Sequence, residues 1–549
     1  MLEQDLHSVA FPRLDSAQMA SLGSCTGATL KRYRDGEKLF SVGDREFNFF
    51  VIKSGAIEII DDSGERSKTL AVLGPGEFTG DVAHLTGRPA VASGVARGDT
   101  EVYEISPEGL RHILNQYPDL GDTILQAFIA RRQMLRESKD FVGLRVIGSR
   151  YSRDTFRVRD FLARNRVLFT WLDLENDPQV DQLLRQLGYT EADTPVVAWG
   201  RKLVLRNPSN RQLAEALGIR QPLERKIYDL VIAGGGPAGL AAAVYGASEG
   251  LDTVVLERIA PGGQASRSMR IENYLGFPTG ITGGDLADRA VLQANKFGAR
   301  LPVPAPVVSL RFDNSYSVLC LEDGDSVAAK CLLIATGAEY RRLVAEGCER
   351  FEGSGVFYAA TLNEAPLCQG AEVIVVGGGN SAGQAAVFLA NLARKVYVVV
   401  RGDNLHKSMS HYLVRRIEET PNIEVLYNTT VRRMHGDGHL GAVELVNQRT
   451  GEVFTIRTPA LFSFIGAVPR SEWLPQEIAR DGKGFISTGP SSDGASGWKN
   501  NRQPFLLETS RPGVFAAGDV RSGSVKRVAS AVGEGAMAVQ FVHEYLKEM

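Results

Sequence analysis

Short apolar runs and turn residues alternate along the first part of the chain. Runs such as 49–52 and 69–73 are followed by glycine or polar residues, and strands with a turn about every ten residues predict a small β-barrel or sandwich. Between Leu110 and Phe128 the apolar residues recur with the period of a helix, which predicts a closing helix. We expect this first domain to span residues 1–138.

The pattern changes after residue 142. Strand-like and helix-like runs now alternate in the order strand, helix, strand, helix, strand, at 142–148, 153–164, 168–173, 178–187 and 195–199. Such alternation predicts a small α/β domain, which we place at 142–220.

The largest segment, 227–549, contains an internal repeat. Residues 229–239 (DLVIAGGGPAG) and 372–382 (EVIVVGGGNSA) each join an apolar strand to a glycine turn and a helix, and a second strand follows. Glycines in this position permit a tight turn and let the backbone approach a pyrophosphate at the helix N-terminus. Two copies in full strand–turn–helix context predict two Rossmann-like dinucleotide-binding domains.

The residues after each second strand indicate which dinucleotide binds. Glu257 follows the first glycine turn by eighteen residues, and a carboxylate there accepts ribose hydroxyls, as in FAD or NAD sites. Arg401 follows the second turn by nineteen residues, and its guanidinium suits the 2′-phosphate of NADP. His406 and Lys407 add positive charge nearby. The alternative for Arg401 is an ordinary surface arginine. We predict one FAD and one NADPH.

Charge and composition exclude several classes of protein. The 549 residues include 62 Lys and Arg against 64 Asp and Glu, so no basic excess indicates nucleic-acid or membrane binding. No apolar run is long enough for a transmembrane helix, and the first residues lack a signal peptide, which predicts a cytoplasmic protein. The five cysteines are scattered and form no Cys-x-x-Cys, so we expect no disulfide framework.

The motifs of segment 227–549 together resemble bacterial-type thioredoxin reductase. In chain order they are Gly234–Gly239, Pro261–Gln264, Ile271–Tyr274, Ala335–Gly337, Gly377–Ala382 and Gly513–Asp519. The resemblance implies an FAD domain split into 227–341 and 470–549, with an NADPH domain at 342–469 between the two parts. It also implies a homodimer.

The resemblance also implies cofactor contacts position by position. For FAD the implied residues are Gly234, Gly236, Pro237, Ala238, Gly239, Glu257, Gly263, Gln264, Asn273, Val307, Gly337, Gly518, Asp519, Arg527, Val528 and Ala529. For NADPH they are Gly377, Gly379, Asn380, Ser381, Ala382, Arg401, His406 and Lys407.

The redox cysteine pair of that family is missing from this chain. Ala359 and Leu362 stand at its two positions, and neither side chain can form a thiolate. Cys368, nine residues beyond Ala359, is either a displaced redox thiol or a buried, inert one. Cys348 lies between polar residues, so we expect it to be exposed, with a pKa raised by its acidic neighbours.

The middle segment resembles a glutaredoxin or thioredoxin-like fold. The resemblance implies a cis bond between Thr194 and Pro195, facing the redox motif. Ser149 and Ser152 stand where a dithiol would be, and serine cannot exchange disulfides. We therefore expect this domain to dock or bind and not to transfer electrons.

The N-terminal segment resembles a cyclic-nucleotide-binding domain, through Gly36, Gly43, Asp44, Gly55 and the run 80–87. In the phosphate-binding stretch Asp81 replaces a glutamate and Ala90 replaces an arginine, which removes the main partner of a cyclic phosphate. Arg88 is the candidate substitute. The candidate pocket residues are Gly80, Asp81, Arg88 and Ser93. Whether this domain binds a cyclic nucleotide is left open by the sequence. No helix-turn-helix follows, so a transcription factor has little support.

His435 and His439 flank the sequence Gly-Asp-Gly. An Asp-Gly pair between two strand-like runs is typical of a hairpin turn, which we prefer to a metal site. We predict no metal.

Three functions fit these residues. The first is an NADPH-dependent FAD oxidoreductase that delivers electrons to an unidentified small-molecule or protein acceptor. The second is a thioredoxin-disulfide reductase that uses Cys368 or a partner's thiols. The third is a regulatory protein whose flavoprotein module senses redox state while the N-terminal domains pass it to a partner.

Overall fold

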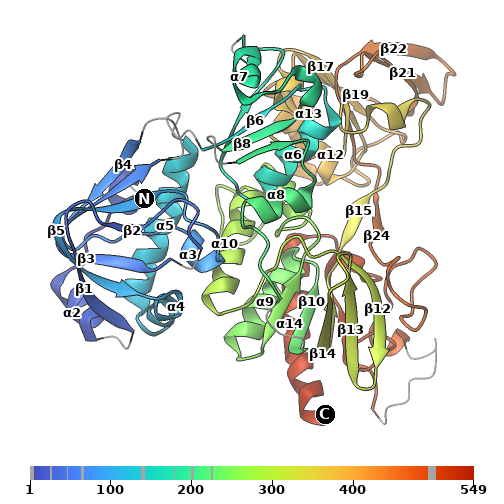
Figure 1. Cartoon of the computed structure of the whole chain (residues 1–549). Coiled ribbons are helices and arrows are strands. Elements are labelled where there is room, and N and C mark those ends of the chain that lie inside the picture. The colour runs from blue at the N-terminus through green and yellow to red at the C-terminus, as the bar shows by residue number, and fades with distance from the viewer. Residues whose placement is uncertain are drawn as a thin grey trace.

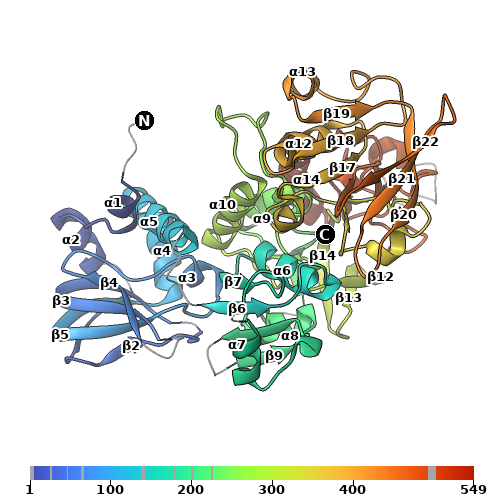
Figure 2. The ribbon, with the colours of Figure 1, turned by 90° about the horizontal axis from the view of Figure 1, so that it is seen from above.

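A computed structural model describes residues 5–24, 27–45, 47–62, 67–137, 143–178, 180–199, 203–223, 227–492 and 502–549 (Figure 1). The chain forms an N-terminal domain (residues 5–137), a middle domain (143–223) and a two-lobed module (227–549). The middle domain and α10 (Gly283–Lys296), a helix of the module, lie between the N-terminal domain and the lobe formed by residues 341–466 (Figure 2).

The N-terminal domain is a five-stranded antiparallel sheet with helices against it. The strands are β1 (Ala28–Tyr33), β2 (Lys38–Phe40), β3 (Phe49–Asp61), β4 (Lys68–Leu73) and β5 (Ser93–Ile105), in the order β1-β5-β3-β4 with β2 on β5. The helices are α1 (Leu6–Ala10), α2 (Ser16–Ser24), α3 (Ala83–Thr86), α4 (Pro107–Gln116) and α5 (Pro118–Glu137). The predicted closing helix is thus two helices, because Pro118 disfavours helical geometry at Tyr117.

The middle domain is a four-stranded mixed sheet in the order β7-β6-β8-β9. Its elements are β6 (Leu144–Ile147), α6 (Arg153–Arg164), β7 (Phe169–Leu172), α7 (Val180–Leu187), β8 (Val196–Trp199), β9 (Leu203–Arg206) and α8 (Asn210–Ala216). The bond between Thr194 and Pro195 is cis, as the resemblance implied. The first five elements were predicted, whereas β9 and α8 were not.

The first lobe of the module draws strands from both ends of segment 227–549. Its sheet holds β12 (Val307–Asp313), β13 (Tyr316–Leu321), β14 (Ser326–Ile334), β10 (Ile227–Ala233) and β11 (Thr253–Leu256), and β25 (Val514–Ala516) pairs with β14. The helices are α9 (Pro237–Ser248), α10 and α14 (Val528–Glu548). Since β25 joins this sheet, the lobe is assembled around an inserted second lobe.

The second lobe, residues 341–466, has a parallel sheet in the order β16-β23-β17-β18-β19. These strands are β16 (Val356–Phe357), β17 (Glu372–Val376), β18 (Lys395–Val399), β19 (Ile423–Leu426) and β23 (Leu461–Ser463), and the helices are α11 (Ala365–Cys368), α12 (Asn380–Ala390) and α13 (His411–Glu419). A three-stranded sheet joins them, of β20 (Thr429–His435), β21 (Ala442–Asn447) and β22 (Val453–Arg457).

Two short strands, β15 (Ala338–Tyr340) and β24 (Ala467–Pro469), pair and link the lobes. The predicted hairpin is confirmed, since His435 pairs with Ala442 across β20 and β21. Among the described residues, no helix is both long and apolar enough to cross a membrane.

Candidate functional site

The first glycine turn joins β10 to α9 and has no room for side chains. A Cβ at Gly234 would lie 2.3 Å from the carbonyl oxygen of Ala335, and one at Gly239 would lie 1.9 Å from that of Gly234. Gly234 also has a φ of +109°, which favours glycine. Gly236 is the N-cap of α9, and Pro237 occupies its first turn. The close packing leaves a bare helix N-terminus, which suits a phosphate.

Two further segments close around this turn. The N–H of Gly262 donates to the carbonyl oxygen of Gly235 at 2.7 Å, and a Cβ at Gly263 would lie 2.9 Å from the Cα of Gly236. Gly518 packs from the C-terminal part of the chain, where a Cβ would lie 3.1 Å from the Cβ of Ala238. The structure therefore gathers predicted residues from three distant segments into one glycine-lined cradle.

Glu257 borders the cradle at the end of β11. Its Oε2 accepts the N–H of Gly235 at 2.8 Å, and its Oε1 accepts the N–H of Ile259 at 3.0 Å. A carboxylate offers about four acceptor positions, so two stay open for ribose hydroxyls. The backbone thus holds the predicted ribose partner in place.

The other predicted FAD residues lie around the same lobe. Asp519 follows β25, and burial raises the pKa of its carboxyl. Arg527 is the exposed N-cap of α14. Gln264, Asn273 and Ala529 are exposed, while Val307, Gly337 and Val528 are half-buried.

The second glycine turn repeats this geometry between β17 and α12. A Cβ at Gly377, whose φ is +141°, would lie 2.5 Å from the carbonyl oxygen of Phe464. Gly379 is the N-cap of α12, and Ala382 is fully buried. Asn380 accepts the N–H of Ser410 through its Oδ1 at 2.7 Å. This turn also leaves a helix N-terminus with room for a phosphate.

Tyr340, in the strand pair between the lobes, was not predicted as a site residue. Its hydroxyl donates to the Oγ of Ser381 at 2.9 Å, and burial raises its pKa. It therefore joins the inter-lobe link to the second glycine turn. The only feature of the sequence that points to this role is an aromatic residue three positions after Gly337.

Arg401 is a cation beside the second turn whose guanidinium is available to a ligand. It lies exposed two residues after the end of β18 and has no carboxylate partner among the residues that the structure describes. Lys407, by contrast, pairs with Asp403 at 2.9 Å, and the Nε2 of His406 lies 4.0 Å from Glu418. Of the three predicted cations, Arg401 is the most available to an added phosphate.

The loop after β16, residues 358–364, carries the two positions at which the resemblance implies redox cysteines, Ala359 and Leu362. Ala359 is buried, while Leu362 is 65% exposed. Cys368 follows in α11, fully buried, and its Sγ donates to the carbonyl oxygen of Glu364 at 3.4 Å. Burial raises the pKa of this thiol far above its usual range. These surroundings argue against Cys368 as a redox thiol.

The predicted exposure of Cys348 is wrong. Only 2% of this residue is exposed, because it packs with Phe351 and Met434 in an apolar cluster of the second lobe. Burial first, and then Glu352 and Glu349, raise the pKa of the thiol to about 11. The charged neighbours in sequence point outward and concealed the inward direction of the cysteine.

The middle domain lies against residues 357–366 of the second lobe through α6 and Arg150. The Nη2 of Arg159 donates to the carbonyl oxygen of Asn363 at 3.1 Å, and the Nη1 of Arg150 donates to that of Pro366 at 3.3 Å. The ring of Phe156 lies 5.2 Å from that of Phe357, with the planes at 50°. Sequence reasoning did not foresee this contact, which joins the middle domain to the segment that holds Ala359 and Leu362.

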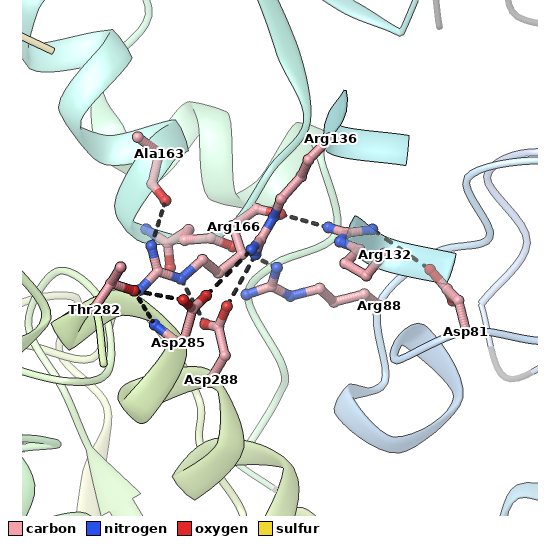
Figure 3. Close-up of polar contacts among 10 residues, drawn as sticks. Asp81, Arg88, Arg132, Arg136, Ala163, Arg166, Thr282, Asp285 and Asp288 are labelled. Carbon is pink, nitrogen blue, oxygen red and sulfur yellow. Dashed lines mark hydrogen bonds and ion pairs between the residues drawn. The ribbon is translucent and has the colours of Figure 1, made fainter. Parts of the chain in front are cut away.

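In the N-terminal domain the structure separates the four predicted pocket residues. Gly80 and Asp81 line a cavity of about 200 Å³. Ser93 instead donates to the carboxylate of Asp62 at 3.0 Å. Arg88 as the phosphate partner is wrong, because its guanidinium is buried and donates to the carbonyl oxygen of Asn165 in the middle domain (Figure 3).

An arginine network ties the three parts of the chain together (Figure 3). Arg132, on α5, pairs with Asp81 at 3.4 Å and also donates to the carbonyl oxygen of Arg166. Arg166 and Arg136 both pair with Asp288 on α10, at 2.5 and 2.9 Å. Burial, together with these neighbouring cations, lowers the pKa of Arg88 to about 10. The N-terminal domain therefore reaches the first lobe through charged groups.

Two family models match the chain. The model for pyridine nucleotide-disulphide oxidoreductases matches residues 228–535, and the model for the cyclic nucleotide-binding domain matches residues 30–117. Among curated proteins, a thioredoxin reductase of Bacillus subtilis is 35% identical over 327 residues, which is 59% of this chain and 97% of that protein.

Solved structures give the same picture. A thioredoxin reductase of Lactococcus lactis aligns with a TM-score of 0.53 at 30% identity, covering 59% of this chain and all of that one. A thioredoxin reductase of T. acidophilum aligns with the same TM-score and identity, covering 58% of this chain and 99% of that one.

Proposed function

Because the chain belongs to the pyridine nucleotide-disulphide oxidoreductase family, we propose that its two-lobed module binds FAD at the first glycine turn and NADPH at the second. The observation that carries this proposal is the pair of turns that admit no side chain, one bordered by the carboxylate of Glu257 and the other by Arg401. The carboxylate suits ribose hydroxyls and the guanidinium suits a 2′-phosphate.

When bound, the two cofactors supply hydride transfer between nicotinamide and flavin. The residues of the chain bind and orient them. The unpaired N–H groups at the N-termini of α9 and α12 attract the pyrophosphates. The carboxyl of Asp519, next to Gly518 in the chain, is partly buried and places a polar group inside the first lobe. No side chain of the described residues is assigned as an acid, base or nucleophile.

The electron acceptor, in this proposal, comes from outside the chain. Ala359 and Leu362 cannot carry electrons, and the candidate thiol that follows them in the chain, Cys368, is buried with a raised pKa. The middle domain also holds the 358–364 loop through Arg159. We therefore favour a small molecule or an electron-carrier protein over a disulfide that exchanges with this loop. Reduction of a disulfide by a partner's own thiols is the alternative.

For the middle domain we propose a thioredoxin-like fold that serves as a fixed docking element. The strand order β7-β6-β8-β9 and the cis Thr194–Pro195 bond support the fold. Ser149 donates to the carboxylate of Glu175 at 2.5 Å, and Ser152 caps α6. Both serines thus have structural partners, which supports a role without electron transfer.

The arginine network favours a second candidate function, regulation of the module by the N-terminal domain. Arg132 contacts the cavity residue Asp81 on one side and the middle domain on the other.

For the assembly we propose a homodimer. Light scattering coupled to size-exclusion chromatography measures the oligomeric state directly.

Electron counting tests the central proposal. The full chain, loaded with FAD, is titrated anaerobically with NADPH while the flavin absorbance is followed. We expect two electrons per flavin, and the same count in the Cys368→Ser variant. Four electrons in the wild type, reduced to two by Cys368→Ser, would overturn the assignment of Cys368 as inert. Failure to retain FAD at all would overturn the cofactor assignment.

A further inference from the structure

The N-terminal sheet and α5 line a cavity, partly open to solvent, that the oxidoreductase proposal does not use. Its volume is about 200 Å³. The lining is mainly apolar and comes from the strands and their loops as well as from the last turns of α5, as with Phe40, Phe47, Ile59, Leu73, Met134 and Leu135. Water in such a cavity finds few polar partners, so an apolar occupant is favoured over solvent.

The only cation that lines the cavity among the described residues is already engaged. Arg131 donates from its Nε to the carbonyl oxygen of Ala10 at 2.8 Å, and from its two Nη atoms to those of Gly80 and Phe78 at 2.7 and 2.9 Å. Its guanidinium therefore holds the backbone around the cavity together. A ligand phosphate that recruited this arginine would have to break buried hydrogen bonds.

The acidic group at the cavity is engaged as well, and its charge opposes an anion. The Oδ1 of Asp81 accepts the N–H of Ala83 at 2.9 Å, and its Oδ2 faces Arg132 at 3.4 Å. The carboxylate thus takes a backbone donor at the start of α3 that a phosphate would otherwise use. Neither Arg132 nor Arg88 lines the cavity, and Arg88 is buried against Asn165.

We propose that this cavity binds a small, uncharged and mainly apolar molecule, and not a cyclic nucleotide. Among the described residues that line the cavity, a phosphate would find no free cation and would face the carboxylate of Asp81, which is costly for a charge removed from water. An uncharged apolar ligand makes no such demand and gains from leaving water. The inference concerns the N-terminal domain alone and stands whether or not the two-lobed module acts as proposed.

Neighbouring residues on β4 provide a matched pair of variants. Ala71 lines the cavity, whereas Val72, the next residue, is 45% exposed and does not line it. Successive side chains on a strand point to opposite faces. Ala71→Asp therefore places a charge inside the cavity, and Val72→Asp places the same charge outside it. Ala71→Phe fills the cavity without adding charge.

The test uses the full chain and N-phenyl-1-naphthylamine, an uncharged apolar probe that fluoresces more strongly outside water. We expect saturable binding of one probe per chain, weakened at least tenfold by Ala71→Asp and by Ala71→Phe and unchanged by Val72→Asp. A thousandfold excess of cyclic AMP or cyclic GMP should not displace the probe. No binding by the wild type, equal binding by all variants, or displacement by a cyclic nucleotide would each overturn the proposal. Circular dichroism checks that each variant is folded, and the Phe variant serves if the Asp variant is not.

Discussion

Arg159 of the middle domain donates from its Nη2 to the carbonyl oxygen of Asn363, one residue beyond Leu362, at 3.1 Å. The guanidinium also lies 3.6 Å from the ring centre of Trp171. Burial of this arginine lowers its pKa to about 10. One charged side chain thus connects the core of the middle domain to the loop that holds Ala359 and Leu362.

Removing this contact should loosen the loop. We expect Arg159→Ala to raise hydrogen–deuterium exchange of the amides at 360–364 about fivefold or more, because a charge-assisted hydrogen bond contributes about 1.5–3 kcal/mol. Arg157→Ala is the control, since Arg157 contacts Asp154, Pro208 and Asn207 within the middle domain. Equal exchange at 360–364 in the two variants would show that Arg159 does not order the loop.

The second prediction concerns the choice of nicotinamide cofactor. Arg401 is exposed and has no carboxylate partner among the described residues, so its charge is available to a 2′-phosphate. We expect Arg401→Ala to raise the KM for NADPH about tenfold to a hundredfold, because the lost contact contributes about 1.5–3 kcal/mol. The KM for NADH should change little.

A paired cation nearby provides the comparison for Arg401. Lys407 already faces Asp403 at 2.9 Å, so Lys407→Ala should alter the KM for NADPH much less than Arg401→Ala does. Steady-state kinetics with both cofactors and a soluble dye acceptor measure these constants. Equal losses with NADPH and NADH in Arg401→Ala would refute the 2′-phosphate assignment.

The glycine turns and the hairpin, which the sequence predicted, are fixed by local geometry. A Cβ at Gly239 would collide with Gly234 only five residues away, so the requirement is written in a short motif. The hairpin after His435 likewise follows from its own Asp-Gly pair. The predicted role of Arg88 differs from its place in the structure because its partner, the carbonyl oxygen of Asn165, is distant in sequence. That partner is a backbone group, which every residue carries, so the sequence does not indicate it.

Burial was the other property that the sequence concealed. Cys348 stands among charged residues in the chain, yet its side chain packs against residues such as Met434, far along the sequence. The α6 contact with the second lobe was missed for the same reason, because Phe156 and Phe357 meet only after two domains have folded and docked. Contacts between domains carry no local period that a sequence pattern could reveal.

The third prediction tests the arginine network between the N-terminal domain and the first lobe. Asp288 pairs with both Arg136 and Arg166, and its side chain is 27% exposed. Asp285 lies 3.9 Å from Arg136 with its side chain 51% exposed. We expect Asp288→Ala to lower the free energy of unfolding by about 2 kcal/mol, since it strands partly buried cations, and Asp285→Ala by less than about 1 kcal/mol.

Thermal unfolding at low and high salt distinguishes these two variants. The part of the Asp285→Ala effect that comes from the pair with Arg136 should vanish at about 1 M salt, because exposed pairs are screened. The loss of the hydrogen bond that Asp285 accepts from the Thr282 hydroxyl remains at any salt concentration, as does most of the effect of Asp288→Ala. If both variants behave alike at each salt concentration, the network does not stabilise the contact between α5 and α10.

The fourth prediction concerns Glu364, a buried carboxyl at the end of the 358–364 loop, two residues after Leu362. Its Oε2 accepts the N–H and hydroxyl of Thr361 at 2.7 and 2.6 Å, while its Oε1 has no hydrogen-bond partner among the described residues. Burial raises the pKa of this carboxyl from 4.5 to about 7, opposed by Arg267 and assisted by Asp160. Between those two values the folded protein keeps a proton that the unfolded chain has lost.

The free energy of unfolding should therefore fall as the pH rises through that window. A shift of this size corresponds to about 3 kcal/mol, fully present below pH 4.5 and lost by pH 8. Glu364→Gln carries no titrating proton, so its stability relative to the wild type should increase by about that amount between pH 4.5 and pH 8. Urea denaturation of both proteins across this range gives the difference directly. A curve for Glu364→Gln that runs parallel to that of the wild type would show that burial does not raise the pKa of Glu364.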